Sequence, residues 1–155
     1  MRAAIGVAKY KTADTTIDSG GVGTTFTDDP HLAGWDMSTP GFYMVDGYLE
    51  ASAISTTPDM KFLMQFTAGT GHHYSGWTYL GALTTTALLV GQKTALETTN
   101  VIQLSSAARS GVILRGYVEV DEDCTMDFQW AQNTSSVDDV VLHEGSWINV
   151  RHIGP

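Results

Sequence analysis

The sequence predicts an all-β protein, an antiparallel β-sandwich or closed barrel, and three observations carry this prediction. Apolar and polar residues alternate over many short segments, which is the pattern of half-buried strands. Turn-forming residues separate these segments. No window keeps the i, i+3, i+4, i+7 apolar spacing of an amphipathic helix, and the best candidate, 82–89, contains three consecutive threonines that favour extended backbone.

The clearest strands alternate along most of their length. In the first of them, Tyr43, Val45 and Leu49 fall on one face while Phe42 and Met44 fall on the other. The five strongest segments are residues 41–51, 60–66, 111–120, 124–131 and 146–153. Weaker strand signals cover residues 12–17, 76–83, 87–90 and 101–104, which gives about eight or nine strands in all.

Two of these segments repeat each other. G-F-Y-M-V-D-G-Y-L-E-A at 41–51 returns as G-V-I-L-R-G-Y-V-E-V at 111–120. After a polar turn, each leads into a second similar segment, M-K-F-L-M-Q-F at 60–66 and M-D-F-Q-W at 126–130. The repeat predicts two equivalent long hairpins, in which Gly47 and Gly116 mark a bulge, a bend or the close approach of a neighbouring aromatic.

Length and composition favour one domain. A chain of 155 residues that is 43% apolar can bury a proper core. We expect this domain to span residues 12–155, preceded by residues 1–11 as an arm that packs on another chain or as an edge strand.

Charge and cysteine content exclude several classes of protein. The net charge of -9 disfavours nucleic-acid binding, because counterion release from phosphates needs a basic surface. Cys124 is the only cysteine, so no intrachain disulfide can form, and we expect it to pack as a small apolar side chain. The N-terminal apolar run is too short for a signal peptide, and no segment approaches the ~20 apolar residues of a membrane helix. We therefore expect a soluble protein without nucleic-acid or membrane partners.

The sequence contains no recognisable catalytic motif, so we expect no enzyme, no cofactor and no metal. It lacks both the G-x-S-x-G nucleophile elbow and the phosphate-binding loop. His72 and His73 are adjacent and would point to opposite faces of a strand, which favours loop histidines over a metal site. The acidic runs at 28–29, 121–123 and 138–139 lack the calcium-loop pattern and are typical of solvated turns.

Several aromatic residues in glycine-rich, partly polar surroundings are candidates for a subunit interface or a sugar-stacking patch. Core packing is the alternative for Trp77. The candidates are Trp35, Tyr74, Trp77 and Tyr79.

Taken in order, several motifs resemble those of virion proteins of tailed bacteriophages. They are D-D-P-H-L at 28–32, G-F-Y-M-V-D-G at 41–47, P-D-M-K-F at 58–62, F-Q-W-A-Q-N at 128–133 and E-G-S-W-I-N-V at 144–150. The likeness spans residues 12–153, with D-M-K-F standing where the family has a D-F-K-like element. It implies a jelly-roll sandwich, comparable with the tumour-necrosis-factor-like fold, that forms trimers.

Two positions in the virion are usual for domains of this kind. The short segment before the first plausible strand and the acidic charge favour a capsid decoration or cement protein on the outer surface of the head, with itself and the major capsid protein as partners. The alternative is a receptor-binding module of a tail fibre or spike that recognises a host glycan. The candidate capsid contacts are Arg2, Lys9, Tyr10 and Lys11.

Overall fold

A computed structural model describes most of the chain as strands. The described residues are 6–17, 23–55, 58–67, 77–84, 87–93, 99–104 and 108–155. They form two antiparallel sheets, one of eight strands and one of five, and contain no helix. The all-β prediction is confirmed.

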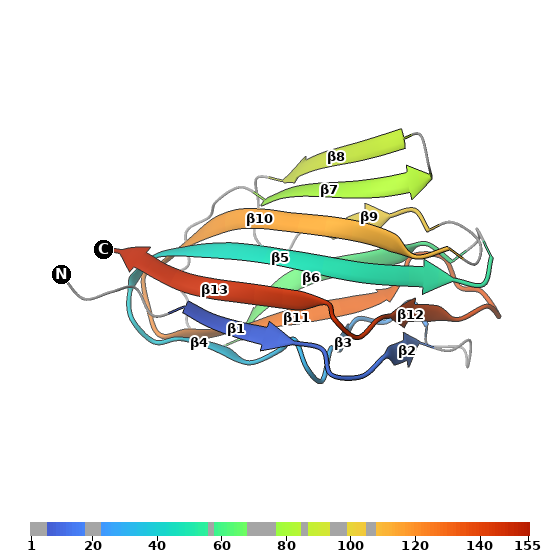
Figure 1. The fold of residues 1–155 in the computed structure, drawn as a ribbon. Helices are drawn as coiled ribbons and strands as arrows, with labels where there is room; N and C mark the ends of the chain where they lie inside the picture. The colour runs from blue at the N-terminus through green and yellow to red at the C-terminus, as the bar shows by residue number, and fades with distance from the viewer. Residues whose placement is uncertain are drawn as a thin grey trace.

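The larger sheet, which we call sheet A, has the order β1-β13-β5-β10-β7-β8, and β12 pairs with both β5 and β2. Figure 1 shows β5, β10 and β13 side by side along the length of the molecule. The strands of sheet A are β1 (Gly6–Tyr10), β2 (Thr15–Ile17), β5 (Gly41–Ala53), β7 (Trp77–Thr84), β8 (Ala87–Lys93), β10 (Ser110–Val120), β12 (Val140–Leu142) and β13 (Trp147–Gly154).

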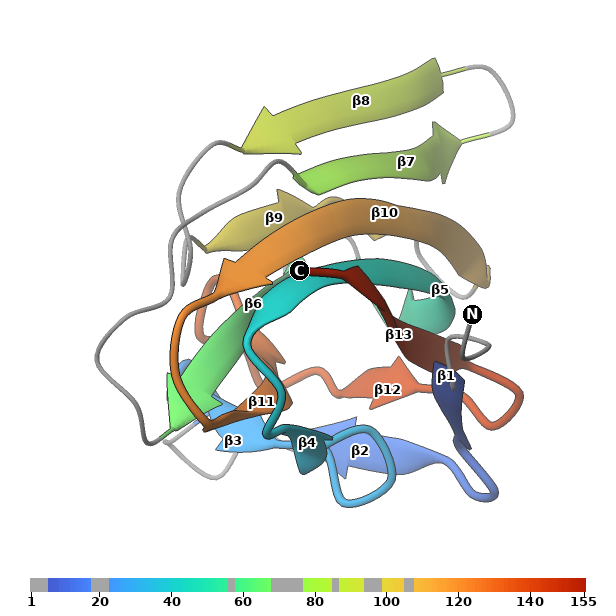
Figure 2. The same cartoon turned by 90° about the vertical axis from the view of Figure 1, so that its left-hand side faces the viewer.

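The smaller sheet, sheet B, has the order β3-β11-β6-β9, and β4 pairs with β11. Its strands are β3 (Thr27–Asp28), β4 (Trp35–Met37), β6 (Met60–Thr67), β9 (Asn100–Ile102) and β11 (Cys124–Gln132). Figure 2 shows the two sheets facing each other, with β7 and β8 extending sheet A beyond β10.

The chain passes back and forth between the sheets. β5 lies in sheet A, β6 in sheet B, the β7–β8 hairpin in sheet A, β9 in sheet B, β10 in sheet A and β11 in sheet B. Neighbouring strands within each sheet are therefore mostly far apart in the sequence, which is the arrangement of a jelly roll. The jelly-roll sandwich is thus confirmed by the strand order itself.

The predicted pair of long hairpins is wrong. β5 and β6 belong to different sheets, as do β10 and β11, so each polar turn crosses from one sheet to the other. The repeated segments pair with each other instead: β5 with β10 in sheet A, and β6 with β11 in sheet B. The repeat therefore reflects two equivalent crossings of the sandwich, and local alternation cannot distinguish a crossing from a hairpin.

The strand count also exceeds the prediction, because the described residues form thirteen strands where eight or nine were expected. The missed strands are β3, β4 and β12, which span only two or three residues, too few for a period of two to be visible. β1 corresponds to the edge strand that was one of the two alternatives for residues 1–11. β1 pairs with β13 at the edge of sheet A, so residues 6–10 form an edge strand of the domain.

The core lies between the sheets and follows the predicted alternation. In β5, alternate residues from Tyr43 to Ala53 are buried, and in β10 alternate residues from Ser110 to Val120 are buried. Sheet B supplies the largest buried side chains, among them Trp130 and Phe128. Burial of this apolar surface is the main term that stabilises such a fold.

Gly47 lies where two neighbouring strands approach closely. A Cβ at this position would lie 2.9 Å from the carbonyl oxygen of Trp147 and 3.2 Å from Cγ1 of Ile148. The register of β5 against β10 and β13 is continuous at this point, so the glycine marks close approach and not a bulge.

Cys124 is buried at the start of β11, as the sequence predicted. Burial raises the pKa of its thiol, and the nearby carboxylates of Asp123 and Asp36 raise it further. The reactive thiolate is therefore both scarce and enclosed.

We expect Cys124 of the folded protein to resist alkylation at neutral pH and to react completely once the protein is unfolded in denaturant. Titration with a chromogenic disulfide reagent, with and without guanidinium chloride, measures this. Rapid labelling under native conditions would show that the edge of sheet B near β4 opens readily.

Candidate interaction face

The outer face of sheet A carries large apolar side chains where a solvated sheet would carry polar ones. The outward positions of β5, β10 and β13 alternate with the buried core positions. Among the outward residues, Ile113 is 53% exposed and Tyr117 is 44% exposed, while Tyr48 and Trp147 are half-buried. This face is the leading candidate for a functional surface.

Four of these side chains form a continuous line across neighbouring strands. Tyr10 in β1 pairs with Trp147 in β13, Trp147 pairs with Tyr48 in β5, and Tyr48 pairs with Ile113 in β10. Directly paired residues of an antiparallel sheet project from the same face, so the four side chains lie side by side. We call Tyr10, Trp147, Tyr48 and Ile113 the outer row.

Local packing fixes Tyr48 within the outer row. Its ring lies against Gly111 of β10, where a Cβ would stand 2.8 Å from the tyrosine oxygen. Because Gly111 has no side chain, the ring can lean along the sheet. The register continues from Ile113 to Leu80 in β7 and then to Val90 in β8.

A polar row runs beside the outer row. Asn149, Asp46 and Arg115 occupy paired positions on β13, β5 and β10. Nε of the exposed Arg115 lies 3.4 Å from Oδ1 of Asp46, which is an ion pair without hydrogen-bond alignment. Oδ1 of Asp46 is buried and has no hydrogen-bond partner among the residues that the structure describes.

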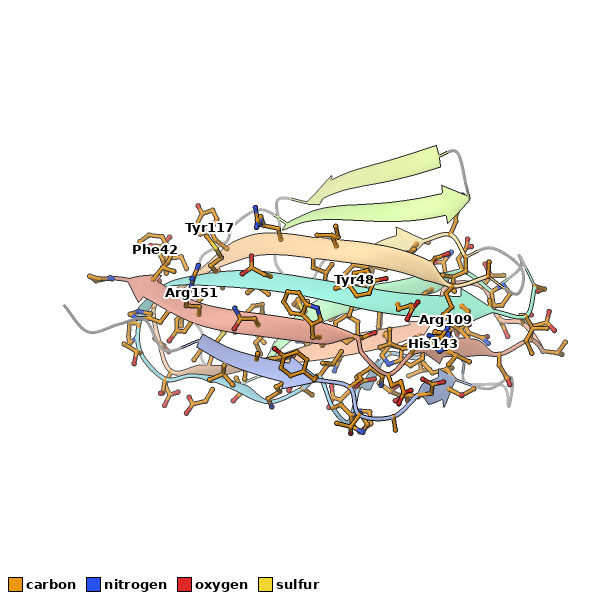
Figure 3. The ribbon with its side chains drawn as sticks, viewed as in Figure 1. Phe42, Tyr48, Arg109, Tyr117, His143 and Arg151 are labelled. Carbon is orange, nitrogen blue, oxygen red and sulfur yellow. The ribbon has the colours of Figure 1, made fainter. Side chains whose placement is uncertain are left out.

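A second apolar group lies at the end of this face that carries the C-terminus. The rings of Phe42 and Tyr117 are 6.1 Å apart, and the guanidinium of Arg151 donates to the sulfur of Met44 at 3.4 Å. Figure 3 shows Phe42, Tyr117 and Arg151 gathered at this end, with Tyr48 farther along the sheet. Nε of Arg151 is buried and, within the described part of the chain, has no hydrogen-bond partner.

The outer row borders an open hollow of about 370 Å³. Tyr48, Trp147 and Ile113 supply apolar walls, while Asp46 and Arg115 supply an acceptor and a donor. Aromatic walls with a few polar groups are typical of surfaces that recognise a partner or a sugar.

The structure places the predicted capsid contacts in different environments. Tyr10 is 59% exposed and belongs to the outer row. Lys9 points the other way, and its ammonium donates to the carbonyl oxygens of Ala33 and Gly34 and lies 5.2 Å from the centre of the Trp35 ring. Arg2 lies outside the described residues.

Lys11 is a structural residue and not a surface cation. Its side chain and that of Asp29 are fully buried, and Nζ lies 2.7 Å from Oδ2 of Asp29 and 2.5 Å from Oγ1 of Thr15. Oδ1 of Asp29 accepts hydrogen bonds from the backbone N–H groups of His31 and Leu32. The ammonium is enclosed within the domain, so the prediction of a capsid contact at Lys11 is corrected: a partner could not reach this charge.

The aromatic candidates for an interface or sugar-stacking patch also lie in different parts of the structure. Trp35 is 2% exposed and belongs to the core, so it is not part of a surface patch. Trp77 and Tyr79 lie in β7, where their backbones pair with Gly116 and Leu114, and their side chains lie outside the described part of the structure. Tyr74, His72 and His73 lie outside the described residues.

Sequence reasoning missed Tyr48, Trp147 and Ile113 as site residues. The signal was present, because each occupies an outward position in an alternating strand where a polar residue is usual. Only the register shows that these positions, far apart in the sequence, form one row.

Two further properties of the described residues bear on function. They include no group of three or more His, Cys, Asp or Glu side chains placed to hold a metal ion. The described part of the chain also contains no helix with the length and apolarity needed to cross a bilayer.

Comparison with known proteins gives distant structural likenesses only. No family model matches the sequence, and no curated protein matches it. Eiger TNF from S. frugiperda has 10% sequence identity and a TM-score of 0.48 over 99% of this chain and 94% of its own. Murine APRIL has 8% identity and a TM-score of 0.48 over 97% of this chain and 100% of its own.

A bacterial lipoprotein from Bacteroides thetaiotaomicron has 8% identity and a TM-score of 0.27 over 99% of this chain and 90% of its own. None of these three structures is described as a virion protein. The jelly-roll assignment therefore depends on the strand order of this chain.

Proposed function

We propose that this protein is a structural protein of a tailed bacteriophage, a decoration or cement protein that binds the outer capsid lattice as a homotrimer. The observation that carries the proposal is the outer row. The rings of Tyr48 and Trp147 are partly open to solvent, and Tyr10 and Ile113 beside them are exposed. Aromatic side chains in such a position are characteristic of protein interfaces. The viral setting and the trimeric state come from the sequence resemblance.

Cementing is a mechanical task that suits a trimer. Each subunit contributes a modest contact, and linked copies bind together far more tightly than one copy alone. The net charge of -9 suits an outer surface away from packaged DNA. We assign the outer row, including Tyr10, to the subunit contact, and of the expected capsid contacts we keep Arg2, together with residues 6–9 of the edge strand β1.

Ile113→Asp is expected to dissociate the trimer into folded monomers. Ile113 is 53% exposed, so the fold tolerates the change, whereas an interface would have to bury an unpaired carboxylate. The loss should be roughly 2 kcal/mol or more per contact, or about 30-fold in affinity. Light scattering after size exclusion, over a range of protein concentrations, measures it.

Val137→Asp is the matched control, because Val137 is 84% exposed and lies outside the outer row. It should leave the oligomeric state unchanged. A wild-type protein that stays monomeric at all concentrations would contradict the assembly.

Capsid binding is tested with phage heads stripped of the protein. Re-addition of the wild-type chain should restore resistance to heat, and antibody labelling should cover the whole head. Absence of binding to heads, with the trimer intact, would disprove cementing while leaving self-association in place.

The hollow beside the outer row favours a second candidate, a glycan-recognition module of a tail fibre or spike. Tyr48 and Trp147 provide surfaces for sugar stacking, and Asp46 and Arg115 provide hydrogen-bonding groups. A glycan array with hits that Trp147→Ala abolishes, together with labelling at the tail tip, would favour this function over cementing.

A further inference from the structure

Three side chains from distant parts of the sequence meet near the end of sheet A opposite the C-terminus. Ser52 lies in β5, His143 directly follows β12, and Asp14 lies between β1 and β2. Oγ of Ser52 is 2.8 Å from Nε2 of His143, and Nδ1 of His143 is 3.2 Å from Oδ2 of Asp14. A hydroxyl, an imidazole and a carboxylate therefore form one hydrogen-bonded chain.

Backbone hydrogen bonds hold His143 and Asp14 in place. The N–H of His143 donates to the carbonyl oxygen of Glu50 at 2.8 Å, and the N–H of Glu144 donates to Oδ1 of Asp14 at 2.7 Å. Oδ2 of Asp14 is then left for the imidazole. This hydrogen bond from Glu144, followed by the contact with His143, keeps the pKa of Asp14 below its usual value, so the carboxylate stays ionised.

The solvent exposure of the three side chains differs in the way that a reactive serine requires. His143 is 7% exposed, whereas Ser52 is partly exposed and the side chain of Asp14 is half-exposed. The ring is therefore held rigidly while the hydroxyl stays within reach of solvent. A nucleophile bonded to a base that a third group orients is the usual geometry of an activated serine.

We propose that Ser52 is an activated nucleophile, with His143 as its general base and Asp14 as the positioning residue that orients the imidazole. Asp14 accepts from Nδ1–H, which leaves the lone pair of Nε2 directed at the hydroxyl of Ser52. The proposal is independent of trimer formation and of capsid binding, because it uses none of the residues of the outer row.

The reaction is acyl transfer from a small, activated carboxylic ester. Oγ of Ser52 bonds to the carbonyl carbon as its proton passes to Nε2 of His143. The ester C–O bond then breaks, and the leaving alkoxide takes that proton. Water next attacks the acyl-serine as its proton passes to Nε2 of His143. The bond between the acyl carbon and Oγ then breaks and Oγ takes that proton, which releases the carboxylic acid and restores the hydroxyl of Ser52.

Arg109 is the cation beside this group. Its guanidinium lies 3.1 Å from Oε2 of Glu50, and the adjacent Ser110 pairs with Ala51, next to Ser52. Figure 3 shows Arg109 and His143 at the same end of the sheet. Arg109 is exposed and screened by solvent, so it would stabilise an oxyanion weakly, and reactive esters with good leaving groups are the expected substrates.

The test is active-site labelling of the full-length protein with a fluorophosphonate probe, followed by mass spectrometry to find the modified residue. Labelling at Ser52 should be about 100-fold faster than at the exposed Ser135, because a positioned general base contributes at least this factor. A burst of p-nitrophenol from p-nitrophenyl acetate should accompany acylation.

Variants separate reactivity from stability. Ser52→Ala should abolish the label and the burst, Ser135→Ala should change neither, and Asp14→Asn should slow both while the half-exposed site leaves the melting temperature nearly unchanged. His143→Gln should abolish labelling even where circular dichroism shows an intact fold. Equal labelling of Ser52 and Ser135, or labelling of Ser52 that persists in folded His143→Gln, would overturn the proposal and leave the three residues as a structural contact between turns.

Discussion

Lys11→Met is expected to lower the free energy of unfolding by about 3–5 kcal/mol, because removal of one partner from a buried ion pair leaves the other charge uncompensated. Asp29 would remain fully buried with no cation opposite its Oδ2. The pair also joins the chain after β1 to the turn before β4, so its loss loosens that end of the sandwich. Chemical denaturation monitored by tryptophan fluorescence measures the change.

Two further variants test the cause. Arg115→Met removes a cation from an exposed ion pair and should have an effect of about 0–1 kcal/mol. Lys11→Met combined with Asp29→Asn should recover part of the loss, since an asparagine oxygen can still accept from His31 and Leu32. A Lys11→Met protein as stable as the wild type would show that this pair does not stabilise the fold.

Trp130→Ala is expected to be destabilising by about 3–5 kcal/mol, the usual range for removing a large aromatic side chain from a core. Trp130 is 1% exposed and lies in β11, where Phe62 of β6 is its paired residue. The cavity would open in the middle of sheet B, where neighbouring strands on both sides limit collapse. Thermal unfolding at fixed protein concentration measures the loss.

Trp147→Ala is the matched control, because it makes the same substitution on the half-buried outer face. It should affect stability mainly where subunits associate, so its effect should grow with protein concentration. The effect of Trp130→Ala should be large at every concentration. Equal, concentration-independent losses for the two variants would contradict the assignment of Trp147 to an interface.

The local pattern of the sequence predicted the strands but not their partners. The alternation in 41–51 and 111–120 is visible to any reader of the sequence, and both segments are strands with the expected buried faces. Whether two successive strands form a hairpin or cross between sheets depends on the path of the turn, and a polar turn suits both. The pairing of β5 with β10 therefore could not be read from the repeat.

The candidate surfaces were likewise predicted only in part by the sequence. Apolar residues at outward positions, such as Tyr48 and Ile113, mark a face that something covers, and the sequence contains that signal. The prediction of Lys11 as a surface contact failed because a lysine beside an exposed tyrosine gives no sign of a buried carboxylate eighteen positions away in the chain.

By itself the sequence determined the class of fold, the two faces of the long strands and the burial of Cys124, because each follows from period-two contact with a single core. Tertiary structure alone decided the order of the strands, the pairing of Lys11 with Asp29, the outer row, and the meeting of Ser52, His143 and Asp14. These features join residues far apart in the chain, and long-range pairing in a jelly roll is fixed by how two whole sheets pack and not by any local pattern.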